Sequence, residues 1–312
     1  MKNYIFPSVY DYSDYMLKDV KNIKNVEIVT FKMSYFQKFL WRIRNIKINK
    51  ISYLLSTALF NSLFKKHNFN DCVFFIFDSN PFFLDFQFYQ WIKKKHSKVL
   101  LVAIVYNVIN GNQMKLEVLN EFYDKVYTFD PNEASKYNYL HFWGIYSPVE
   151  HITTSTEYDI SFIGLDKGRL NIIKDISNKL DKLKLKFNIN IIINIDKEYG
   201  KLSNINLLKE RVTYFDSIEL IKKSNCLLEI VDENQTGLSL RTIESIIYKK
   251  KLLTNNKNIL LSPYYDKENM EIIYDFHDIS EEFIRGVYVD NAIDRDFSFK
   301  RILSEVSIVE EL

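Results

Sequence analysis

The chain has 312 residues, 47% of them hydrophobic, and its 42 Lys and Arg against 40 Asp and Glu leave a formal net charge of +2. A chain of this length is better divided between two domains than packed around one core. The balanced charge excludes a global field for binding nucleic acid, so any basic surface must be local.

Its cysteines and apolar runs restrict where the protein can work. Cys72 and Cys226 each lie inside an apolar run without disulfide or metal-ligand spacing, which fits a reducing cytoplasm. The first residues lack the apolar core of a signal peptide, and no run reaches the about 18 apolar residues of a membrane span. We expect a cytoplasmic protein, with the inner face of the cell membrane as the alternative location.

Five short apolar runs predict β-strands in the first half, near residues 3–6, 26–31, 72–78, 98–106 and 125–130. Unbroken runs of this length suit strands that are covered on both faces. Segments with helical spacing separate them, at 13–22, 34–67, 81–96 and 112–124. This alternation predicts an α/β domain with a doubly wound parallel sheet.

A basic stretch lies within this half. No Asp or Glu occurs between Ile28 and Asn70, although eight cations do: Lys32, Lys38, Arg42, Arg44, Lys47, Lys50, Lys65 and Lys66. Apolar residues at helical spacing, Phe36, Phe39, Leu40 and Ile43, would form one face of a helix. Lys38 and Arg42 would form another face, so residues 32–50 could bind an anionic membrane surface. The alternative is a core helix with solvated cations, since aromatic stripes usually face a core.

A helix start follows the fifth predicted strand. Asp130 is placed to cap it, Pro131 occupies the first helical position and Glu133 the third. We expect these residues to serve capping alone.

The polar, turn-rich segment 147–159 marks a domain boundary, because the alternation of strand and helix restarts after it. We predict an N-terminal Rossmann-like domain over 1–150, a C-terminal Rossmann-like domain over 151–297 and a closing helix over 298–312. In the second domain, predicted helices run from about Gly168 to Leu183 and from about Ser239 to Lys249.

The first glycine turn follows the strand in YDISFIGLDKGRL, residues 158–170. It contains Gly164, Lys167 and Arg169 at the carboxyl edge of the predicted sheet, where ligands bind. A helix start there offers free N–H groups and positive dipole, and the two cations add donors for a diphosphate. Neither known glycine fingerprint for phosphates is present. The alternative is a tight turn with solvated cations.

A second turn, within residues 226–256, repeats this arrangement with more polar residues. We predict a donor-binding role for Gln235, Thr236, Gly237, Ser239, Arg241 and Glu244. Arg241 would bind phosphates, and the Glu244 carboxylate could accept from both hydroxyls of a ribose. The alternative for this i, i+3 pair is a solvated ion pair worth a few tenths of a kcal/mol.

Two carboxylates at strand ends are candidate catalytic residues. Glu229 interrupts an apolar strand, where a buried charge needs a partner, so it either faces a ligand or points to solvent from an edge strand. Asp78 ends the strand 72–78 and could act as a base on an acceptor hydroxyl. Capping of the following helix explains Asp78 equally well.

Three stretches resemble bacterial lipopolysaccharide and capsular-polysaccharide glycosyltransferase-like proteins. LLEIVDENQTGLSLRTIESIIYKKKLLTNN looks like that family's L-[DE]-I, Q-x-G-L-[ST]-x-R-x-x-E and K-K-L-[IL]-T-x-N series. YDISFIGLDKGRL is similar to its F-I-G loop, and YDKVYTFDPNEASKY to its D-K-V-Y-[ST]-F-D segment. The likeness covers about Tyr123 to Asn256. The chain departs from the pattern at Glu229, where Asp is commoner, and at Asn107, where a Trp-Asp pair is expected.

The resemblance implies a GT-B fold of two Rossmann-like domains facing a central cleft. It also implies transfer of a sugar from a nucleotide-sugar donor to a glycan or lipid-linked acceptor in cell-surface polysaccharide synthesis. The second domain would hold the donor and the first the acceptor. Lys167, Arg169 and Arg241 would stabilise the leaving diphosphate in place of a metal ion.

We predict no metal site and no cofactor, because the histidines are isolated and the D-x-D at Asp294 to Asp296 has no strand leading into it. Two alternatives remain open for function. One is a sugar-nucleotide epimerase or hydrolase on the same fold. The other is a non-catalytic assembly protein that keeps a nucleotide-sugar pocket, with Asn107 as the motivating departure.

Overall fold

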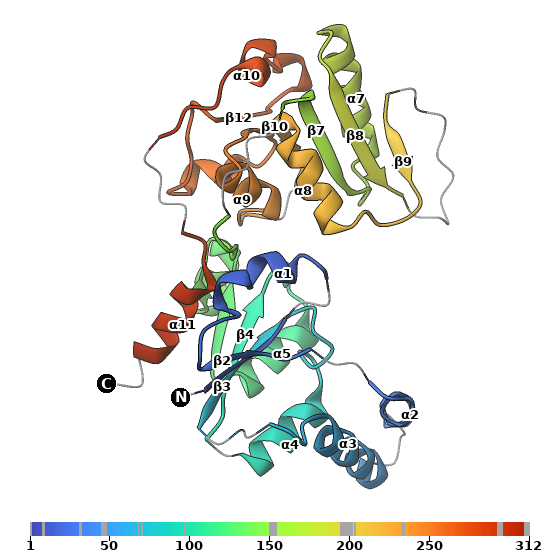
Figure 1. Cartoon of the computed structure of the whole chain (residues 1–312), viewed down its shortest axis with the longest axis vertical. Helices are drawn as coiled ribbons and strands as arrows, with labels where there is room; N and C mark the ends of the chain where they lie inside the picture. The colour runs from blue at the N-terminus through green and yellow to red at the C-terminus, as the bar shows by residue number, and fades with distance from the viewer. Residues whose placement is uncertain are drawn as a thin grey trace. The chain divides into compact units, whose positions relative to one another are not determined.

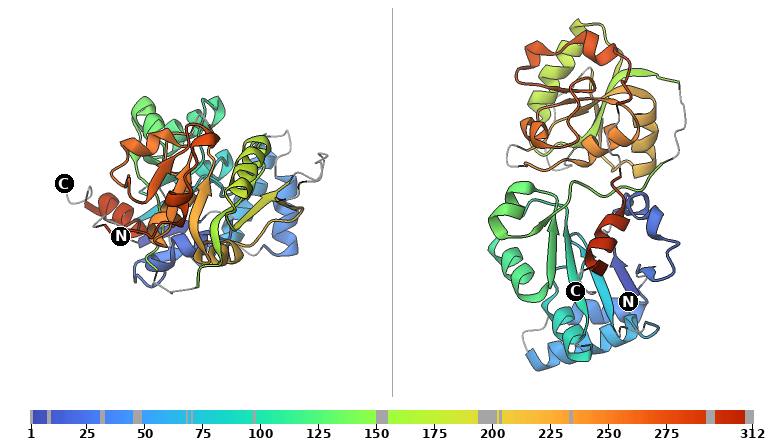
Figure 2. Two further views of the ribbon diagram at one scale, coloured as in Figure 1. Left: turned by 90° about the horizontal axis from the view of Figure 1, so that it is seen from above. Right: turned by 90° about the vertical axis from the view of Figure 1, so that its left-hand side faces the viewer.

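The computed structural model describes residues 2–7, 10–30, 33–44, 49–67, 69, 71–96, 98–149, 155–193, 202, 204–232, 235–291 and 296–308. The chain divides into two compact units, Met1–Phe142 and Trp143–Leu312, which we call unit 1 and unit 2. Each unit contains one six-stranded sheet, and every strand pair in both sheets is parallel. Two further views show helices packed around each sheet (Figure 2).

The sheet of unit 1 has the order β2-β1-β3-β4-β5-β6. Its strands are β1 (Lys2–Phe6), β2 (Val26–Ile28), β3 (Cys72–Phe77), β4 (Leu100–Val105), β5 (Lys125–Thr128) and β6 (Leu140–His141). The first five confirm the predicted strands. β6 is absent from the predicted strands because it is a two-residue edge strand with an exposed Leu140, too short for an apolar run.

Side chains cap the start of several helices in unit 1. They are α1 (Ser13–Met16), the 3-10 helix η1 (Lys18–Val20), α2 (Tyr35–Ile43), α3 (Asn49–Leu63), α4 (Phe86–Lys95), α5 (Gln113–Phe122) and α6 (Pro131–Tyr137) (Figure 1). Ser34 and Gln37 form a capping box at α2, and Asp85 caps α4.

The predicted cap of α6 is confirmed, but Glu133 does more than expected. Asp130 accepts hydrogen bonds from the N–H groups of Asn132 and Glu133, both at 3.1 Å. The Glu133 carboxylate accepts from the N–H groups of Ile109 and Asn110, at 2.6 and 2.9 Å. It therefore fixes the loop that follows β4, and burial raises the pKa of its carboxyl.

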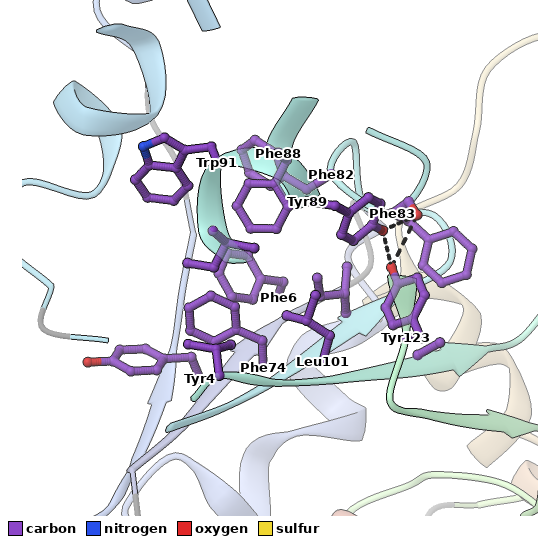
Figure 3. Packing of buried hydrophobic residues seen from close by; sticks show 14 of the residues in the cluster. Tyr4, Phe6, Phe74, Phe82, Phe83, Phe88, Tyr89, Trp91, Leu101 and Tyr123 are labelled. Atoms are coloured by element: carbon purple, nitrogen blue, oxygen red, sulfur yellow. Dashed lines mark hydrogen bonds between the residues drawn. The ribbon is translucent and has the colours of Figure 1, made fainter. Parts of the chain in front are cut away.

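Aromatic side chains form most of the core of unit 1 (Figure 3). Phe74 of β3 meets Tyr4 and Phe6 edge to face, with ring centroids 5.4 and 5.1 Å apart. These edge contacts place the positive ring edge against the negative ring face, which favours them over flat stacking. Near the rim, the hydroxyl of Tyr123 donates to the carbonyl of Phe83 at 3.1 Å, so the buried phenol is satisfied.

The sheet of unit 2 has the order β12-β11-β10-β7-β8-β9. Its strands are β7 (Tyr158–Leu165), β8 (Phe187–Ile192), β9 (Asn206–Leu208), β10 (Ser224–Glu229), β11 (Lys251–Thr254) and β12 (Met270–Ile272). Counted from β7, this is the Rossmann order 3-2-1-4-5-6, which reverses between β7 and β10. The strand order thus puts the ends of β7 and β10 side by side.

The helices of unit 2 are α7 (Leu170–Lys182), α8 (Tyr214–Lys222), α9 (Leu240–Ile247), η2 (Lys257–Leu261), η3 (Phe276–Asp278), α10 (Glu281–Arg285) and α11 (Phe299–Ile308). α7 and α9 follow β7 and β10, and they begin within two residues of the predicted starts at Gly168 and Ser239. α11 lies inside the predicted closing segment 298–312. No helix in the described ranges is long and apolar enough to cross a membrane.

The aromatic core gives a stability prediction. Phe74 is fully buried, so Phe74→Ala should lower the free energy of unfolding by about 3 to 5 kcal/mol, because a cavity adds to the lost transfer energy. Phe36→Ala, at a side chain that is 64% exposed, should change it by about 0.5 kcal/mol or less. Urea denaturation of the two variants measures both values, and equal losses would contradict the packing described.

Candidate functional site

A pocket of about 270 Å³ opens in unit 2 at the carboxyl ends of β7 and β10. These are the strands between which the order reverses, where doubly wound sheets bind their ligands. Six residues predicted from the sequence line the pocket: Lys167, Arg169, Glu229, Gln235, Ser239 and Arg241. The structure therefore brings the two glycine turns to one concave surface.

The other predicted residues lie elsewhere. Gly164, Thr236, Gly237 and Glu244 are not part of the pocket lining among the residues that the structure describes. Asp78 belongs to unit 1. Apolar side chains of the strand ends, such as Phe162 and Leu228, complete the lining. Both lie in stretches that carry the family resemblance, although no site role is predicted for them.

The first turn owes its shape to two consecutive residues with positive φ, Lys167 at 45° and Gly168 at 83°. Glycine adopts this region without a steric penalty, whereas Lys167 adopts it at some cost in backbone energy. The carboxylate of Asp166 accepts from the N–H of Leu170, the first residue of α7, at 3.2 Å. Gly168 is therefore needed for backbone conformation rather than for space, since nothing lies near its missing Cβ.

Arg169 joins the ends of the two central strands. Its Nε and Nη2 donate to the carbonyl of Leu165 at 3.0 and 2.9 Å, and its Nη1 donates to the carbonyl of Ile230. Burial lowers the pKa of Arg169, and the nearby charge of Arg241 lowers it further. The predicted alternative of a solvated cation is therefore wrong for Arg169.

Gly164 has a different task from the one predicted. A Cβ at this position would lie 2.9 Å from Nη2 of Arg169 and 3.2 Å from the ring of Phe162. The glycine thus makes room for the guanidinium, which lies over the Phe162 ring at 5.3 Å. Its predicted place beside the ligand is corrected: Gly164 acts through Arg169.

The second turn begins α9. Ser239 is its N-cap and accepts from the N–H of Arg241 at 3.0 Å. The side-chain amides of Gln235 and Asn256 both donate to the carbonyl of Gly237 at 3.3 Å. Gly237 therefore serves as an acceptor that fixes the turn, while residues 233 and 234 lie outside the described part of the chain.

Arg241 and Glu244 form the predicted i, i+3 pair, but it is buried rather than solvated. Nη1 of Arg241 lies 2.9 Å from Oε2 of Glu244, with side chains 16% and 2% exposed. Nη2 of Arg241 also donates to the carbonyl of Ile163 at 3.3 Å. Burial raises the pKa of the Glu244 carboxyl, and the charge of Arg241 opposes that rise. Glu244 thus holds the guanidinium at the end of β7.

A chain of hydrogen-bonded tyrosine hydroxyls holds the Glu244 carboxylate on its other oxygen. The hydroxyl of Tyr214 lies 2.6 Å from Oε1 of Glu244 and 3.1 Å from the hydroxyl of Tyr146, which lies 3.0 Å from that of Tyr248. Burial raises the pKa of Tyr214, so the phenol stays protonated and can donate to the carboxylate. Local sequence patterns do not reveal this network, because its members are up to 102 residues apart.

The carboxylate of Glu229 is occupied by hydroxyl donors. Ser239 and Thr242, both from the start of α9, donate to its Oε1, and the Thr242 contact is 2.7 Å. Thr254 at the end of β11 donates to its Oε2. Glu229 is 2% exposed and β10 is an inner strand, so the predicted edge position is wrong.

These contacts also correct the catalytic role predicted for Glu229. Although the residue contributes to the pocket wall, its carboxylate is committed to binding α9 and β11 to β10. A carboxylate that already accepts hydrogen bonds from three hydroxyls has little capacity left to accept one from a substrate. Glu229 is therefore a positioning residue in this structure.

Asp78 has a distinct environment in unit 1. Its Oδ2 accepts from the backbone and side-chain N–H groups of Asn107, both at 2.9 Å, and lies 3.3 Å from Nζ of Lys115. The predicted capping alternative is wrong, because Asp85 caps α4. Asn107, the departure from the family pattern, therefore directly holds the candidate base.

No three His, Cys, Asp or Glu side chains gather as metal ligands among the residues placed by the structure. Asp294 and Arg295 of the D-x-D sequence lie outside the described residues.

Comparisons by sequence give no relative. No protein-family model matches the chain. No curated protein matches it either.

Comparisons by structure identify the architecture. An α,α-trehalose-phosphate synthase (UDP-forming) from Burkholderia vietnamiensis matches with a TM-score of 0.59 at 8% identity, over 99% of this chain and 98% of that one. The UDP-GlcNAc 2-epimerase from Neisseria meningitidis, bound to UDP-GlcNAc, gives 0.51 at 10% identity, over 99% and 100%. The chain adopts the GT-B fold.

A third match has a longer chain. TarM superposes with a TM-score of 0.54 at 10% identity, over 82% of this chain and 58% of TarM, so this chain spans a little over half of its length. The prediction of two Rossmann-like domains in a GT-B fold is confirmed. At these identities the likeness is one of fold.

The hydroxyl contacts of Glu229 give a prediction that separates a positioning role from a catalytic one. Glu229→Ala should lower the free energy of unfolding by about 1 to 3 kcal/mol, because it leaves buried hydroxyls without their acceptor. Glu229→Gln, which keeps the volume and one acceptor oxygen, should lose less. Urea denaturation measures both, and a Glu229→Ala variant as stable as the wild type would contradict the positioning role.

Proposed function

We propose that the protein is a nucleotide-sugar-dependent glycosyltransferase whose donor binds in the pocket of unit 2. The observation that carries this proposal is the meeting of Lys167, Arg169 and Arg241 around one pocket at the strand crossover. The structural matches support this proposal at the level of the fold. One matched protein is a UDP-forming synthase, and another is an epimerase bound to UDP-GlcNAc.

The chemistry proposed for the pocket is electrostatic. Transfer of the sugar releases a nucleoside diphosphate, and negative charge develops on its phosphates as the bond breaks. Fixed cations and helix N-termini aimed at that charge stabilise the transition state without reorganising. Arg169 and Arg241 both line the pocket, and the charge of Arg241 adds to the burial that lowers the pKa of Arg169, so an anion bound there would stabilise the Arg169 cation. The proposed reaction is metal-independent.

Donor recognition would divide between the two turns. Lys167 and the start of α7 would face the diphosphate from one side, and Arg241, Gln235 and Ser239 from the other. The ribose role of Glu244 stays a prediction, because its contacts in the structure are with Arg241 and Tyr214.

The acceptor role falls to unit 1 in this proposal. Asp78 lies directly after β3, held by Asn107 and Lys115, and remains the candidate base for an acceptor hydroxyl. The family resemblance suggests a glycan or lipid-linked acceptor in cell-surface polysaccharide synthesis.

A sugar-nucleotide epimerase or hydrolase is the second candidate, because the epimerase match covers both chains almost completely. Product analysis distinguishes the two. A transferase forms a new glycoside and releases nucleoside diphosphate only when an acceptor is present, whereas an epimerase or hydrolase consumes UDP-GlcNAc without one. Binding of the nucleotide without any consumption of the sugar nucleotide would favour the non-catalytic assembly protein.

Arg241→Ala should weaken binding of uridine diphosphate by about tenfold or more, because charge-assisted hydrogen bonds to phosphate are worth roughly 1.5 to 3 kcal/mol. Isothermal titration in the presence of a chelator measures the dissociation constant. Lys182→Ala is the matched control, since it removes one positive charge from the exposed far end of α7.

The control variant should bind like the wild type. Failure of the wild type to bind any of a panel of nucleoside diphosphates would overturn the donor site. An equal loss in both variants would attribute binding to net charge rather than to the pocket.

A further inference from the structure

Helix α2 presents aromatic side chains to solvent, contrary to the alternative of a core helix. Tyr35 is 93% exposed, Phe36 64% and Phe39 56%, while Leu40 on the same helix is buried at 4%. The apolar residues that share helical spacing therefore divide between two faces. Leu40 packs in the core of unit 1, and the two phenylalanines do not. Clusters of exposed aromatic side chains are uncommon on soluble proteins and mark interaction sites.

The exposed half of α2 carries cations as well as aromatic rings. At about 100° per residue, Lys38 and Arg42 lie on one side of Tyr35, and Phe39 and Phe36 lie on the other. Lys38 and Arg42 are both exposed, and Nζ of Lys38 lies 6.0 Å from the centre of the Tyr35 ring. Aromatic rings and positive charge are therefore adjacent on one surface.

The other side of α2 is firmly attached to the domain. Gln37 completes the capping box and donates to Ser62 of α3 at 3.0 Å. At the end of the helix, the buried Arg44 pairs with Asp85 and lies 3.8 Å from the centre of the Trp41 ring. The aromatic surface thus sits on a helix with a fixed orientation, beside α3 (Figure 1).

Positions near α2 in the sequence add exposed apolar and positive side chains but no acidic ones. Ile51 and Leu54 of α3 are exposed, as are Lys50, Lys65 and Lys66. No Asp or Glu occurs between Ile28 and Asn70. Lys32 and Lys47 lie outside the described residues. The surface in this proposal is the exposed face of α2.

We propose that the exposed face of α2 docks on an anionic lipid bilayer. Aromatic side chains of this kind partition to the boundary between headgroups and acyl chains, and neighbouring cations bind anionic headgroups. The proposal concerns a surface of unit 1 and does not depend on the nucleotide pocket of unit 2.

Charge favours a bilayer over a second copy of the chain. A twofold dimer through this face would bring Lys38 and Arg42 of one copy near the same residues of the other. With no acid in the surrounding sequence, that contact would be repulsive. An anionic bilayer supplies the opposite charge and an apolar layer together.

Flotation of the full-length protein with lipid vesicles tests the proposal. The probes are vesicles of phosphatidylcholine and phosphatidylglycerol in equal parts, and vesicles of phosphatidylcholine alone. We expect binding to the anionic vesicles at low salt, little binding to the neutral ones, and weakening as salt rises, because salt screens exposed charges. The double variant F36S/F39S should bind the anionic vesicles about tenfold or more weakly.

Phe215→Ser is the matched control, since Phe215 of α8 is 59% exposed in unit 2. Circular dichroism shows that each variant is folded, and light scattering gives the mass of each in solution. Absence of binding to anionic vesicles would overturn the proposal. So would equal weakening by Phe215→Ser, or a wild-type dimer that F36S/F39S converts to a monomer. Loss of nucleotide binding in an Arg241 variant would leave vesicle binding unchanged, so the two proposals fail separately.

Discussion

Two guanidinium groups, those of Arg169 and Arg241, line one small pocket in unit 2, and their fixed placement is the constraint on which the site depends. Arg169 is fixed by the carbonyl groups of Leu165 and Ile230, which tie the ends of β7 and β10 together. Arg241 reaches the same place from α9 and is held by Glu244. The charge of Arg241 adds to the burial that lowers the pKa of Arg169, and a bound anion would act in the opposite direction. The proposed diphosphate would bind beside these two fixed cations.

Buried polar contacts hold these cations in place. Glu229 accepts from hydroxyls on α9 and β11 and so fixes the start of α9 against the sheet. Behind Glu244, Tyr214 and Tyr146 extend the network into the interior of unit 2. Side chains locked by such contacts keep a site in one geometry, and that geometry gives electrostatic stabilisation its strength. Many buried polar side chains of unit 2 therefore hold the cations of the pocket in position.

The sequence predicts the fold and the two turns well, because both depend on local patterns. Apolar runs predicted the inner strands, and the glycine turns after two of them marked the edge of the sheet where the pocket opens. The contacts of individual side chains were harder to predict. Gly164 makes room for Arg169, and Glu229 finds Thr254 25 residues away, contacts that only the folded chain creates. Spacing on α2 likewise described one stripe, whereas packing against α3 buries Leu40 and leaves Phe36 and Phe39 exposed. Short edge strands such as β6 carried no apolar signal at all.

Hydrogen exchange with and without uridine diphosphate tests most directly whether the two turns bind one anion. The account predicts that the backbone N–H groups of residues 165–171 and of residues 237–242 become protected together, at the same ligand concentration. Exposed segments of unit 2 away from the pocket, such as α10, should exchange unchanged. Protection of only one turn, or of neither, would contradict the shared site, because a diphosphate held by Arg169 and Arg241 must contact both.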